Sequence, residues 1–451
     1  MLRCNVYCLG PPQEIKLFKV VRLSIGAALL AATGFGAQTL AAATVYVGSC
    51  GPAKATSYTT IQQAVNASSA GSTVYVCPGT YPEQVTITRN LNLIGVQSGT
   101  ADSAVITSPA SGVVQNTYDL YEPPAYPVAA QVLVQKAQSV NIANITVDGS
   151  NNLIAGCAPD LRGIYYQNAS GSLAGVATRN QTLATGLTGC QSGEGIFVQS
   201  GYGSTGHANV TVQGSSVHSF QKNGVTGDGS ETCLTVLSNY ISGQGATTGA
   251  AENGVQVSDG ASGTVIGNTV IDDIWAPDTS GDSGDAASGI LIYASEGVNI
   301  ANNTVGTTQF GIVTVSDLTS PSPNNPNGAG DHTTIKSNQI LNTQIFDAID
   351  ACSNGNTIEG NAISNATESA IHLDSGCGAT GTNNVVKANF INESCAGILA
   401  GATPNNIGAN SFFNVVNTQL AGNACPAPAS ALVSSATVLA LPGNRHPVPA
   451  R

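Results

Sequence analysis

TIEGNAISNATESAIHLD, residues 357–374, contains a pattern that occurs seven times in this chain: an apolar residue, two further residues, asparagine, one further residue and a second apolar residue. Successive asparagines are 21 to 35 residues apart, and the longer intervals leave room for loops. This period with short strands indicates a solenoid of β-coils, and a leucine-rich repeat fits less well because leucine does not dominate the apolar positions. The asparagines are Asn239, Asn268, Asn303, Asn338, Asn361, Asn389 and Asn410.

Each coil has a second predicted strand, which begins at a small residue. In residues 370–374, Ala-Ile-His-Leu-Asp, apolar and polar residues alternate, so one face is expected to point inward and the other outward. The small residues are Gly224, Gly254, Gly289, Gly311, Ala348, Ala370 and Gly397.

The repeated asparagine has a structural explanation. In a parallel stack, equivalent residues of neighbouring coils lie about 4.8 Å apart, so the asparagine side chains can hydrogen-bond along the stack. Asparagine also tolerates the left-handed conformation that a sharp corner needs. We therefore predict a structural asparagine column without a catalytic role.

The composition limits the classes of fold and partner. Among 451 residues, 52 are glycine and only 9% are charged, which favours strands and turns over helices. The formal net charge of −12 argues against nucleic acid as a partner, because phosphate backbones call for basic patches. Calcium, or a neutral or cation-bridged glycan, is easier to accommodate.

The first 43 residues have the pattern of a signal peptide. Lys16, Lys19 and Arg22 form a basic region, residues 23–32 are apolar, and Ala41–Ala43 offers a cleavage site. Glycines interrupt the apolar run, which is too short to span a membrane. The pattern predicts a secreted or periplasmic protein, cleaved near Ala43 and without a membrane span.

TIQQAVNASSAGSTVYVCPGTYPEQVTITRNLNLIG, residues 60–95, predicts a short helix behind a threonine cap, followed by strands at 74–79, 84–88 and 91–95. We expect the helix to cover the open end of the stack. This segment and the asparagine-containing coils resemble the right-handed parallel β-helix proteins of the pectin-lyase-like superfamily. The resemblance implies an all-β fold with an N-terminal helical cap over residues 44–425, followed by a Pro/Ala-rich tail at 426–451.

The resemblance implies an exported carbohydrate-active protein, either a polysaccharide lyase or a glycoside hydrolase acting on acidic glycans. Its partner would be a polysaccharide or cell-surface glycan, and we expect a monomer. No enzyme signature of the superfamily is complete: Asp272–Asp273 supplies only an acidic pair, and Gly206-His207-Ala208 departs from Gly-His-Gly. The alternative is a non-catalytic glycan-binding, adhesive or structural surface module.

The coil alignment predicts a first polar cluster. Two positions after the small residue, Asp350 and His372 fall on adjacent coils, and Asp374 lies on the same face, with Asp347 and Glu368 near. A carboxylate raises the pKa of a neighbouring histidine and makes it a candidate acid or base. An exposed ion pair is the structural alternative.

A second predicted cluster surrounds Lys222. The alignment makes Lys222 and Glu252 neighbours, with His218 and Asp228 near. A lyase needs a base beside the C5 proton of a uronate, and Lys222 and His218 are candidates. An ion pair between coils is the alternative.

An acidic loop follows, DDIWAPDTSGDSGD, residues 272–285. Oxygen donors between glycine and serine suit calcium, although the spacing is not that of an EF-hand; a solvated loop is the alternative. The candidate calcium ligands are Asp272, Asp273, Asp278, Asp282 and Asp285.

Three aromatic side chains are candidate platforms for sugar rings: Tyr118, Tyr121 and Trp275. The tyrosines belong to YDLYEPPAYP, residues 118–127, a loop that could equally plug against the coils.

Nine cysteines lie beyond residue 43, none of them in a C-x-x-C pair, which argues against zinc. An oxidising compartment allows four disulfides. Among many possible pairings, sequence order suggests Cys50–Cys77, Cys157–Cys190, Cys352–Cys377 and Cys395–Cys425, leaving Cys233 free.

Overall fold

The structure is a computed structural model that describes most of the chain beyond the predicted signal peptide. Residues 1–41 of the predicted signal peptide, the C-terminal tail, Cys377 and Cys425 lie outside the described residues. The described ranges are 42–99, 102–121, 126–276, 286–318, 328–343, 346–375, 379–401, 403–415 and 417–420.

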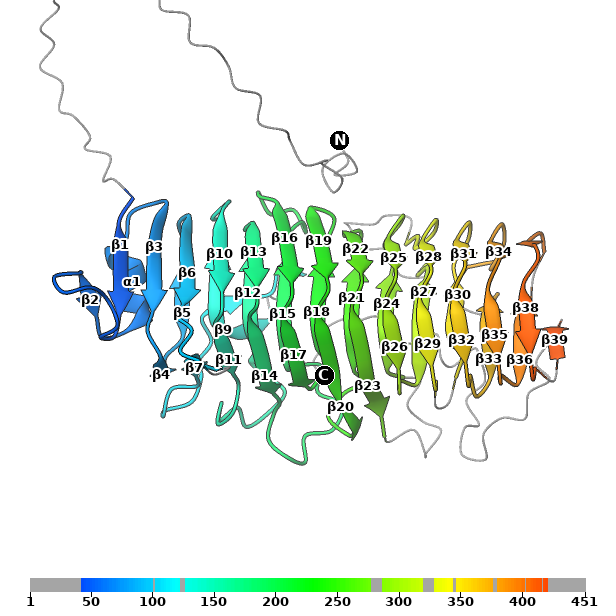
Figure 1. The fold of residues 1–451 in the computed structure, drawn as a ribbon, viewed down its shortest axis with the longest axis horizontal. Helices are drawn as coiled ribbons and strands as arrows, with labels where there is room; N and C mark the ends of the chain where they lie inside the picture. The colour runs from blue at the N-terminus through cyan, green and yellow to red at the C-terminus, as the bar shows by residue number, and fades with distance from the viewer. Residues whose placement is uncertain are drawn as a thin grey trace, which may run out of the picture.

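Three long sheets run side by side along the molecule, and each coil contributes one strand to each sheet in turn (Figure 1). Sheet A has 14 strands: β2 (Ser57–Tyr58), β1 (Thr44–Val47), β3 (Ser72–Val76), β6 (Leu91–Gly95), β10 (Val140–Ala143), β13 (Gly171–Ala174), β16 (Ala208–Gln213), β19 (Thr232–Leu237), β22 (Ser262–Ile266), β25 (Asn299–Ala301), β28 (Thr334–Lys336), β31 (Thr357–Glu359), β34 (Val385–Lys387) and β37 (Asn406–Ile407).

Sheet B has 12 strands: β4 (Gly79–Pro82), β7 (Ala104–Thr107), β11 (Thr146–Asp148), β14 (Ala177–Gln181), β17 (Ser216–Phe220), β20 (Tyr240–Thr247), β23 (Thr269–Trp275), β26 (Thr304–Gly306), β29 (Gln339–Leu341), β32 (Ala362–Ser364), β35 (Phe390–Asn392) and β38 (Ser411–Phe413). Sheet C has 13 strands: β5 (Val85–Ile87), β8 (Thr117–Tyr118), β9 (Pro127–Gln135), β12 (Asp160–Gln167), β15 (Glu194–Gln199), β18 (Asn223–Asp228), β21 (Asn253–Ser258), β24 (Ser288–Tyr293), β27 (Phe310–Val315), β30 (Ile349–Cys352), β33 (Ser369–Leu373), β36 (Ala396–Ala400) and β39 (Asn417–Leu420).

The architecture is the predicted right-handed parallel β-helix. Apart from the antiparallel β8–β9 pair, the paired strands in the described residues are parallel. Helix α1 (Ile61–Ala67) lies at the N-terminal end of the stack in Figure 1 and buries Ile61, Ala64 and Val65. Thr60 caps it, because its side chain accepts from the Gln63 N–H at 3.2 Å. The predicted helical cap is confirmed.

The interior is a continuous column of aliphatic side chains. Val236, Val265 and Ile300 are Cα partners on neighbouring strands of sheet A, and each is fully buried. Isoleucine and valine suit this interior because their branched side chains pack well on a pleated strand.

The asparagine column occupies the corners between sheets A and B. The Asn268 Oδ1 accepts two 2.9 Å hydrogen bonds from Asn239, one from its backbone N–H and one from its Nδ2. The Asn239 Nδ2 also donates to the Val212 carbonyl at 3.0 Å. The same Asn-to-Asn contacts continue, coil by coil, through Asn303, Asn338, Asn361, Asn389 and Asn410. The predicted ladder is confirmed.

The left-handed residue at each corner is not the ladder asparagine. The residue before it takes that conformation instead, with φ of 53° at Ser238, 68° at Gly267 and 56° at Asn302. The expectation that the ladder asparagine itself turns the corner was wrong. Its role is to satisfy backbone groups on neighbouring coils.

A second, shorter ladder was missed by sequence reasoning. The Asn384 Oδ1 accepts from the Asn356 N–H at 2.8 Å and from its Nδ2 at 2.9 Å, and the Asn405 Oδ1 accepts from the Asn384 N–H at 2.8 Å. Asn356 directly precedes β31, so this column lies at the start of the sheet A strands.

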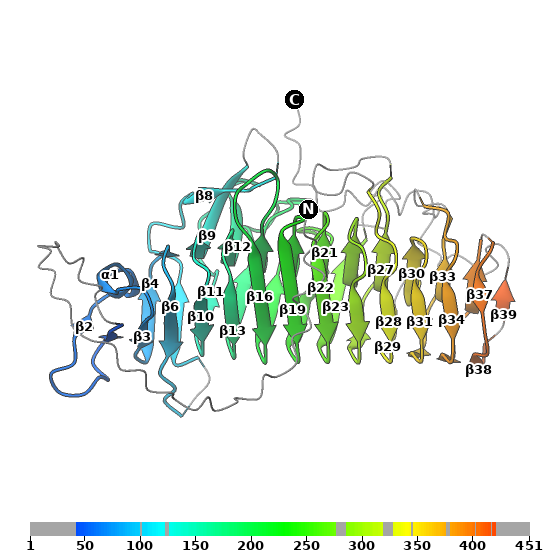
Figure 2. The ribbon, with the colours of Figure 1, turned by 90° about the horizontal axis from the view of Figure 1, so that it is seen from above.

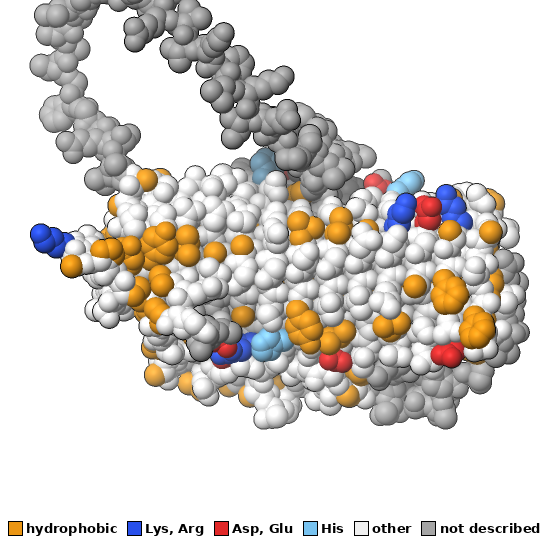
Figure 3. Space-filling view, viewed as in Figure 1, with side chains coloured by type: hydrophobic (Ala, Val, Ile, Leu, Met, Phe, Trp, Pro, Cys, Tyr) orange, Lys and Arg blue, Asp and Glu red, His pale blue; other side chains and the backbone are white. Residues whose placement is uncertain are grey.

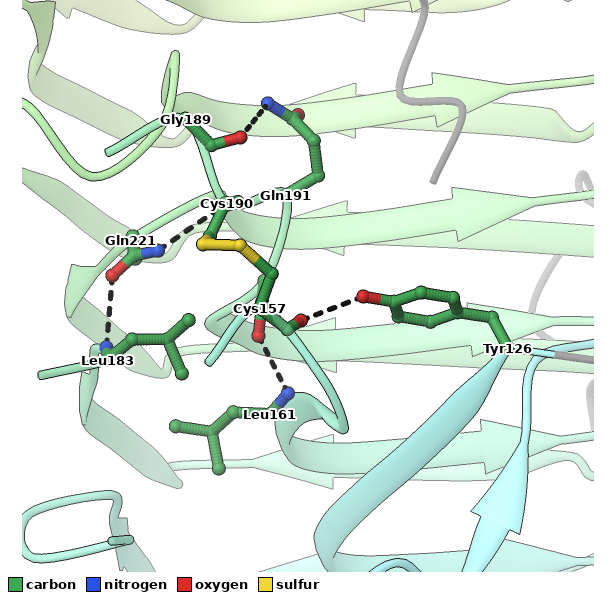
Figure 4. Close-up of a disulfide and its surroundings, with 9 residues drawn as sticks. Tyr126, Cys157, Leu161, Leu183, Gly189, Cys190, Gln191 and Gln221 are labelled. Atoms are coloured by element: carbon green, nitrogen blue, oxygen red, sulfur yellow. Dashed lines mark hydrogen bonds between the residues drawn. A yellow bond between two sulfur atoms is a disulfide. The ribbon is translucent and has the colours of Figure 1, made fainter. Parts of the chain in front are cut away.

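The disulfides Cys50–Cys77 and Cys157–Cys190 are both formed as predicted. In Figure 4, Cys157–Cys190 joins two connections between sheets B and C, and the Tyr126 hydroxyl donates to the Cys157 carbonyl at 2.7 Å. Cys233 is also disulfide-bonded, so the expectation that it stays free was wrong. Cys352 and Cys395 are bonded too, and the partners of these three cysteines lie outside the described residues.

Candidate active site on the outer face of sheet C

Side chains that point outward from sheet C form in-register columns. The column predicted two positions after the small residues is confirmed, because each member pairs with the next through Cα register. Its members are Thr226, Gln256, Leu291, Val313, Asp350, His372 and Leu399.

The structure brings Asp347, Asp350 and His372 together, and we call these three residues the Asp–His cluster. Ile349 and Ile371 are buried in the core and pair across β30 and β33, which places Asp350 directly beside His372. The His372 Nδ1 lies 3.1 Å from the Asp347 Oδ2 and 3.9 Å from the Asp350 Oδ1. The predicted neighbourhood of Asp350 and His372 is therefore present.

Further contacts fix the cluster. The Ser369 N–H donates to the Asp347 Oδ1 at 2.9 Å, and the Ser369 hydroxyl donates to the same atom. The nearest oxygens of Asp350 and Asp374 lie within 4.8 Å of each other. Asp374, also predicted from sequence, thus adjoins the cluster.

Burial and charge oppose each other in this cluster. Burial raises the pKa of Asp350, although His372 lowers it. Burial lowers the pKa of His372, but Asp347 and Asp350 outweigh it and raise the pKa to about 10. The side chain of His372 is 12% exposed, so the cluster reaches the surface at its histidine.

Two sets of side chains in the described residues have donor atoms close enough to share a metal ion. One is the Asp–His cluster, and the other is Asp350, Cys352 and Asp374. Because Cys352 is disulfide-bonded, it offers no thiolate, and only the Asp–His cluster remains a complete set.

A second polar centre, missed from the sequence, surrounds Arg162. This arginine is fully buried, and its guanidinium contacts Asp119 at 2.5 Å, Asp160 at 2.8 Å and Glu194 at 2.8 Å. Phe197 stacks on it, with 3.6 Å from the guanidinium carbon to the ring centroid. Three buried carboxylates thus surround one buried guanidinium, and each depends on it for charge compensation.

The tyrosine loop lies over this centre. Figure 2 shows β8 over the side of the stack that carries β9 and β12, and the Tyr118 side chain there is 52% exposed. Tyr121 is half-buried and packs edge-to-face on Tyr202 at 5.3 Å between centroids. Burial raises the pKa of Tyr126 to about 12. Only Tyr118 of the two predicted platform tyrosines presents a largely open ring.

The predicted cluster around Lys222 is not assembled. His218 lies on β17 of sheet B, where it pairs with Arg179, whereas Asp228 lies on β18 of sheet C and accepts from Gln199 at 2.8 Å. Lys222 Nζ donates to the Ala251 carbonyl at 2.9 Å. The alignment of Cα positions was correct. Because Lys222 lies where the chain turns, that alignment did not determine the direction of the Lys222 side chain.

Glu252 pairs instead with Asp273 in a fully buried carboxyl pair. Both carboxyls lie within 3.0 Å of the point that a Cβ on Gly243 would occupy. Gln244 donates to Glu252 through its backbone and its side chain, whereas both Asp273 oxygens lack a hydrogen-bond partner. Burial raises the pKa of each group, and Glu252 raises that of Asp273 further.

The predicted calcium loop is described only at its start. Asp272 is half-exposed with φ of 65°, whereas Asp273 is fully buried, so the two do not present one open carboxylate face. Trp275 is 4% exposed and packs with Ala251 and Ala287, so its ring is not available as a sugar platform. Asp278, Asp282 and Asp285 lie outside the described residues, and calcium binding there stays a prediction.

Asp273→Asn is expected to raise Tm by a few degrees at neutral pH and to have less effect near pH 4. A raised folded-state pKa means that the folded chain keeps a proton that the unfolded chain has released, so wild-type stability falls as pH rises above about 4. Thermal unfolding across this pH range measures the difference. Asp272→Asn, next door and half-exposed, is the control, and equal curves for both variants would contradict the prediction.

Charged side chains are few on the face of the stack drawn in Figure 3, and several of them lie in small groups of opposite charge. None of the helices in the described part of the chain is both long and apolar enough to cross a membrane.

Comparison with known proteins supports the fold. Residues 327–427, less than a quarter of the chain, match the sequence model of a family described as periplasmic copper-binding protein (NosD). No curated protein sequence is significantly similar to the chain.

Solved structures match over much more of the chain. The native GH136 lacto-N-biosidase from Eubacterium ramulus is 12% identical, with a TM-score of 0.56 over 84% of this chain and 68% of that one. The structure of its selenomethionine derivative is 13% identical, with a TM-score of 0.54 over 84% of this chain and 67% of that one. The Agl-KA catalytic domain is 15% identical, with a TM-score of 0.52 over 78% of this chain and 62% of that one. These matches support the parallel β-helix fold of the chain.

Proposed function

We propose that this chain is an exported protein that binds and processes a glycan at the outer face of sheet C, around the Asp–His cluster. The observation that carries the proposal is the meeting of Asp347, Asp350, Asp374 and His372 from two adjacent coils, at a point where His372 reaches solvent. The similarity to a lacto-N-biosidase in fold, and disulfides typical of oxidising compartments, add support.

The carboxyl groups suit cleavage of a glycosidic bond. Most glycosidases flank the bond with two carboxyl groups, one to protonate the leaving oxygen and one to act as base or nucleophile. Asp350 lies within 4.8 Å of Asp347 and also of Asp374, measured between nearest oxygens. Because Asp350 belongs to both pairs, we expect its substitution to reduce cleavage more than substitution of Asp347 or Asp374.

The surrounding charge favours a neutral glycan and hydrolysis. Asp347, Asp374 and Glu368 surround Asp350, and His372 is the basic group beside it. A uronate would be repelled there, and β-elimination would need a further cation to neutralise the substrate carboxylate. Neutral glycans therefore replace, in this proposal, the acidic ones expected from the sequence.

The test is a screen of the secreted full chain against neutral oligosaccharides and acidic polysaccharides, following new reducing ends and unsaturated products. We expect the wild type to release new reducing ends from a neutral glycan, and the Asp350→Asn variant to release them about 100-fold more slowly. Glu359→Gln, at a half-exposed carboxylate on β31, should keep full activity. Retention of the protein on a glycan without cleavage would support the non-catalytic alternative. If the protein neither cleaves nor retains any glycan of the panel, the proposal is rejected.

Metal binding is a second candidate function. The segment that matches the copper-binding family, residues 327–427, contains the whole Asp–His cluster. Imidazole nitrogen with carboxylate oxygen is a donor combination that suits copper and zinc.

A further inference from the structure

We infer that Asp347, Asp350 and His372 bind one divalent first-row transition-metal ion through two carboxylate oxygens and the His372 Nδ1. The inference gives the second candidate function a specific site and rests on it. It uses the same residues as the glycan proposal, but its test is separate, because metal binding can be measured on protein that cleaves nothing.

The donor geometry supports a small ion. Two ligands bound at about 2.1 Å to a tetrahedral ion lie roughly 3.4 Å apart. The His372 Nδ1 lies 3.1 Å from the Asp347 Oδ2 and 3.9 Å from the Asp350 Oδ1, distances that bracket this value. The ligand oxygens of Asp347 and Asp350 lie within 4.8 Å of each other, so this pair has to draw together for all three donors to meet one ion. The ion would also displace the proton that the His372 Nδ1 shares with Asp347.

An unpartnered buried atom points to a missing ligand. The Asp350 Oδ1 has no hydrogen-bond partner, although the residue is only 3% exposed, and its charge partner, the His372 Nδ1, lies 3.9 Å away, beyond hydrogen-bond distance. Buried carboxylate oxygens are normally paired or bound to a metal, because leaving them unpaired costs free energy. This oxygen faces His372, and an ion between them would satisfy it.

The scaffold holds two of the donors in place before any ion arrives. Asp350 and His372 extend from paired positions of β30 and β33, and the core packing of Ile349 and Ile371 fixes that register. The backbone N–H and hydroxyl of Ser369 hold Asp347 through its other oxygen, Oδ1, which leaves Oδ2 directed at the imidazole. Outer hydrogen bonds of this kind orient metal ligands.

The donor types select the class of ion. Calcium takes six to eight oxygens at 2.3–2.6 Å, and this cluster offers few oxygens and one imidazole. Zinc and copper accept imidazole and carboxylate together in small coordination shells. The remaining positions are available to water or to a group of the bound partner.

The experiment is calorimetric titration of the chelator-treated full chain with Zn²⁺, together with electron paramagnetic resonance of the Cu²⁺-loaded protein. We expect one tight Zn²⁺ per chain and a Cu²⁺ spectrum with nitrogen splitting. His372→Gln should weaken Zn²⁺ binding by about 100-fold or more, since loss of an outer-shell partner alone costs up to that factor. His218→Gln is the matched control, because that histidine also lies on a strand but its Nδ1 faces Ser219.

Asp350→Asn provides a second variant in case His372→Gln does not fold, and should weaken Zn²⁺ binding while circular dichroism stays unchanged. If wild type binds tightly but both variants bind equally well, the assigned site is wrong although metal binding stands. If wild type binds neither ion, the site and the second candidate function both fail. The glycan screen is read from cleavage and retention alone, so failure of the metal site and failure of the glycan proposal can be told apart.

Discussion

Arg162→Met is expected to lower the free energy of unfolding by about 3–5 kcal/mol. The substitution leaves Asp119, Asp160 and Glu194 without the buried guanidinium that they contact at 2.5–2.8 Å. It also removes the cation that stacks on Phe197. Urea denaturation followed by circular dichroism measures the loss.

Arg179→Met is the matched control for this prediction. Arg179 also contacts two carboxylates, Asp102 and Asp148, each at 2.7 Å, but its side chain is 24% exposed. Solvent screens such pairs, so the expected loss is about 1 kcal/mol or less. If both variants lose the same free energy of unfolding, burial of the Arg162 centre does not explain how much it contributes to stability.

Asn338→Ala is expected to cost about 3 kcal/mol, because several buried polar groups lose partners together. The Asn338 Oδ1 accepts from the Asn303 N–H at 3.0 Å and from its Nδ2 at 2.9 Å, and the Asn338 Nδ2 donates to the Ile300 carbonyl at 3.0 Å. The residue is 1% exposed, so water cannot replace these bonds. Urea denaturation with hydrogen exchange would show the loss and its position in the stack.

Asn299→Ala tests whether the effect belongs to the ladder. Asn299 lies four residues before Asn303 in the same coil, half-exposed on the outer face of β25. We expect a change within about 0.5 kcal/mol. The ladder interpretation would be rejected if Asn299→Ala and Asn338→Ala destabilised the chain equally. Exchange in the Asn338 variant should rise most in the neighbouring coils, because each coil contacts only the next.

Much of the fold could be predicted because the coils stack in register. Once the asparagines and small residues had aligned the coils, residues at the same distance from the small residue occupied equivalent positions in neighbouring coils. That alignment correctly placed Asp350 beside His372, which come from positions 22 residues apart. It also identified the small residues, which lie close to the next coil, as at Gly254, where an added Cβ would clash with Val270.

The Arg162 centre was missed because the early coils lack the asparagine. Their corners carry Ile145 and Val176 where later coils carry asparagine, so the pattern gave no alignment there. A signal did exist: Arg162 and Glu194 each directly precede a glycine, as Asn223 precedes Gly224, and the two are Cα partners. Extending the alignment of small residues backwards would have found this pair.

Asp119 was out of reach for a different reason. It is 43 residues from Arg162 and comes from the connection that carries β8, outside the repeating part of a coil. Position within a repeat predicts neighbours only where the chain follows the repeat. Lys222 shows the same limit at a corner, where backbone alignment leaves the direction of a side chain undetermined.

The tight corners between sheets A and B have a consequence for how such a molecule changes in size. From β10 to β35, two residues separate each sheet A strand from the sheet B strand that follows, and extra residues enter elsewhere in the coil. Duplication or deletion can thus add or remove one coil, because the coils on either side can re-form the same corner hydrogen bonds with their new neighbours. The length of the rod and the chemistry of its loops can change independently of each other.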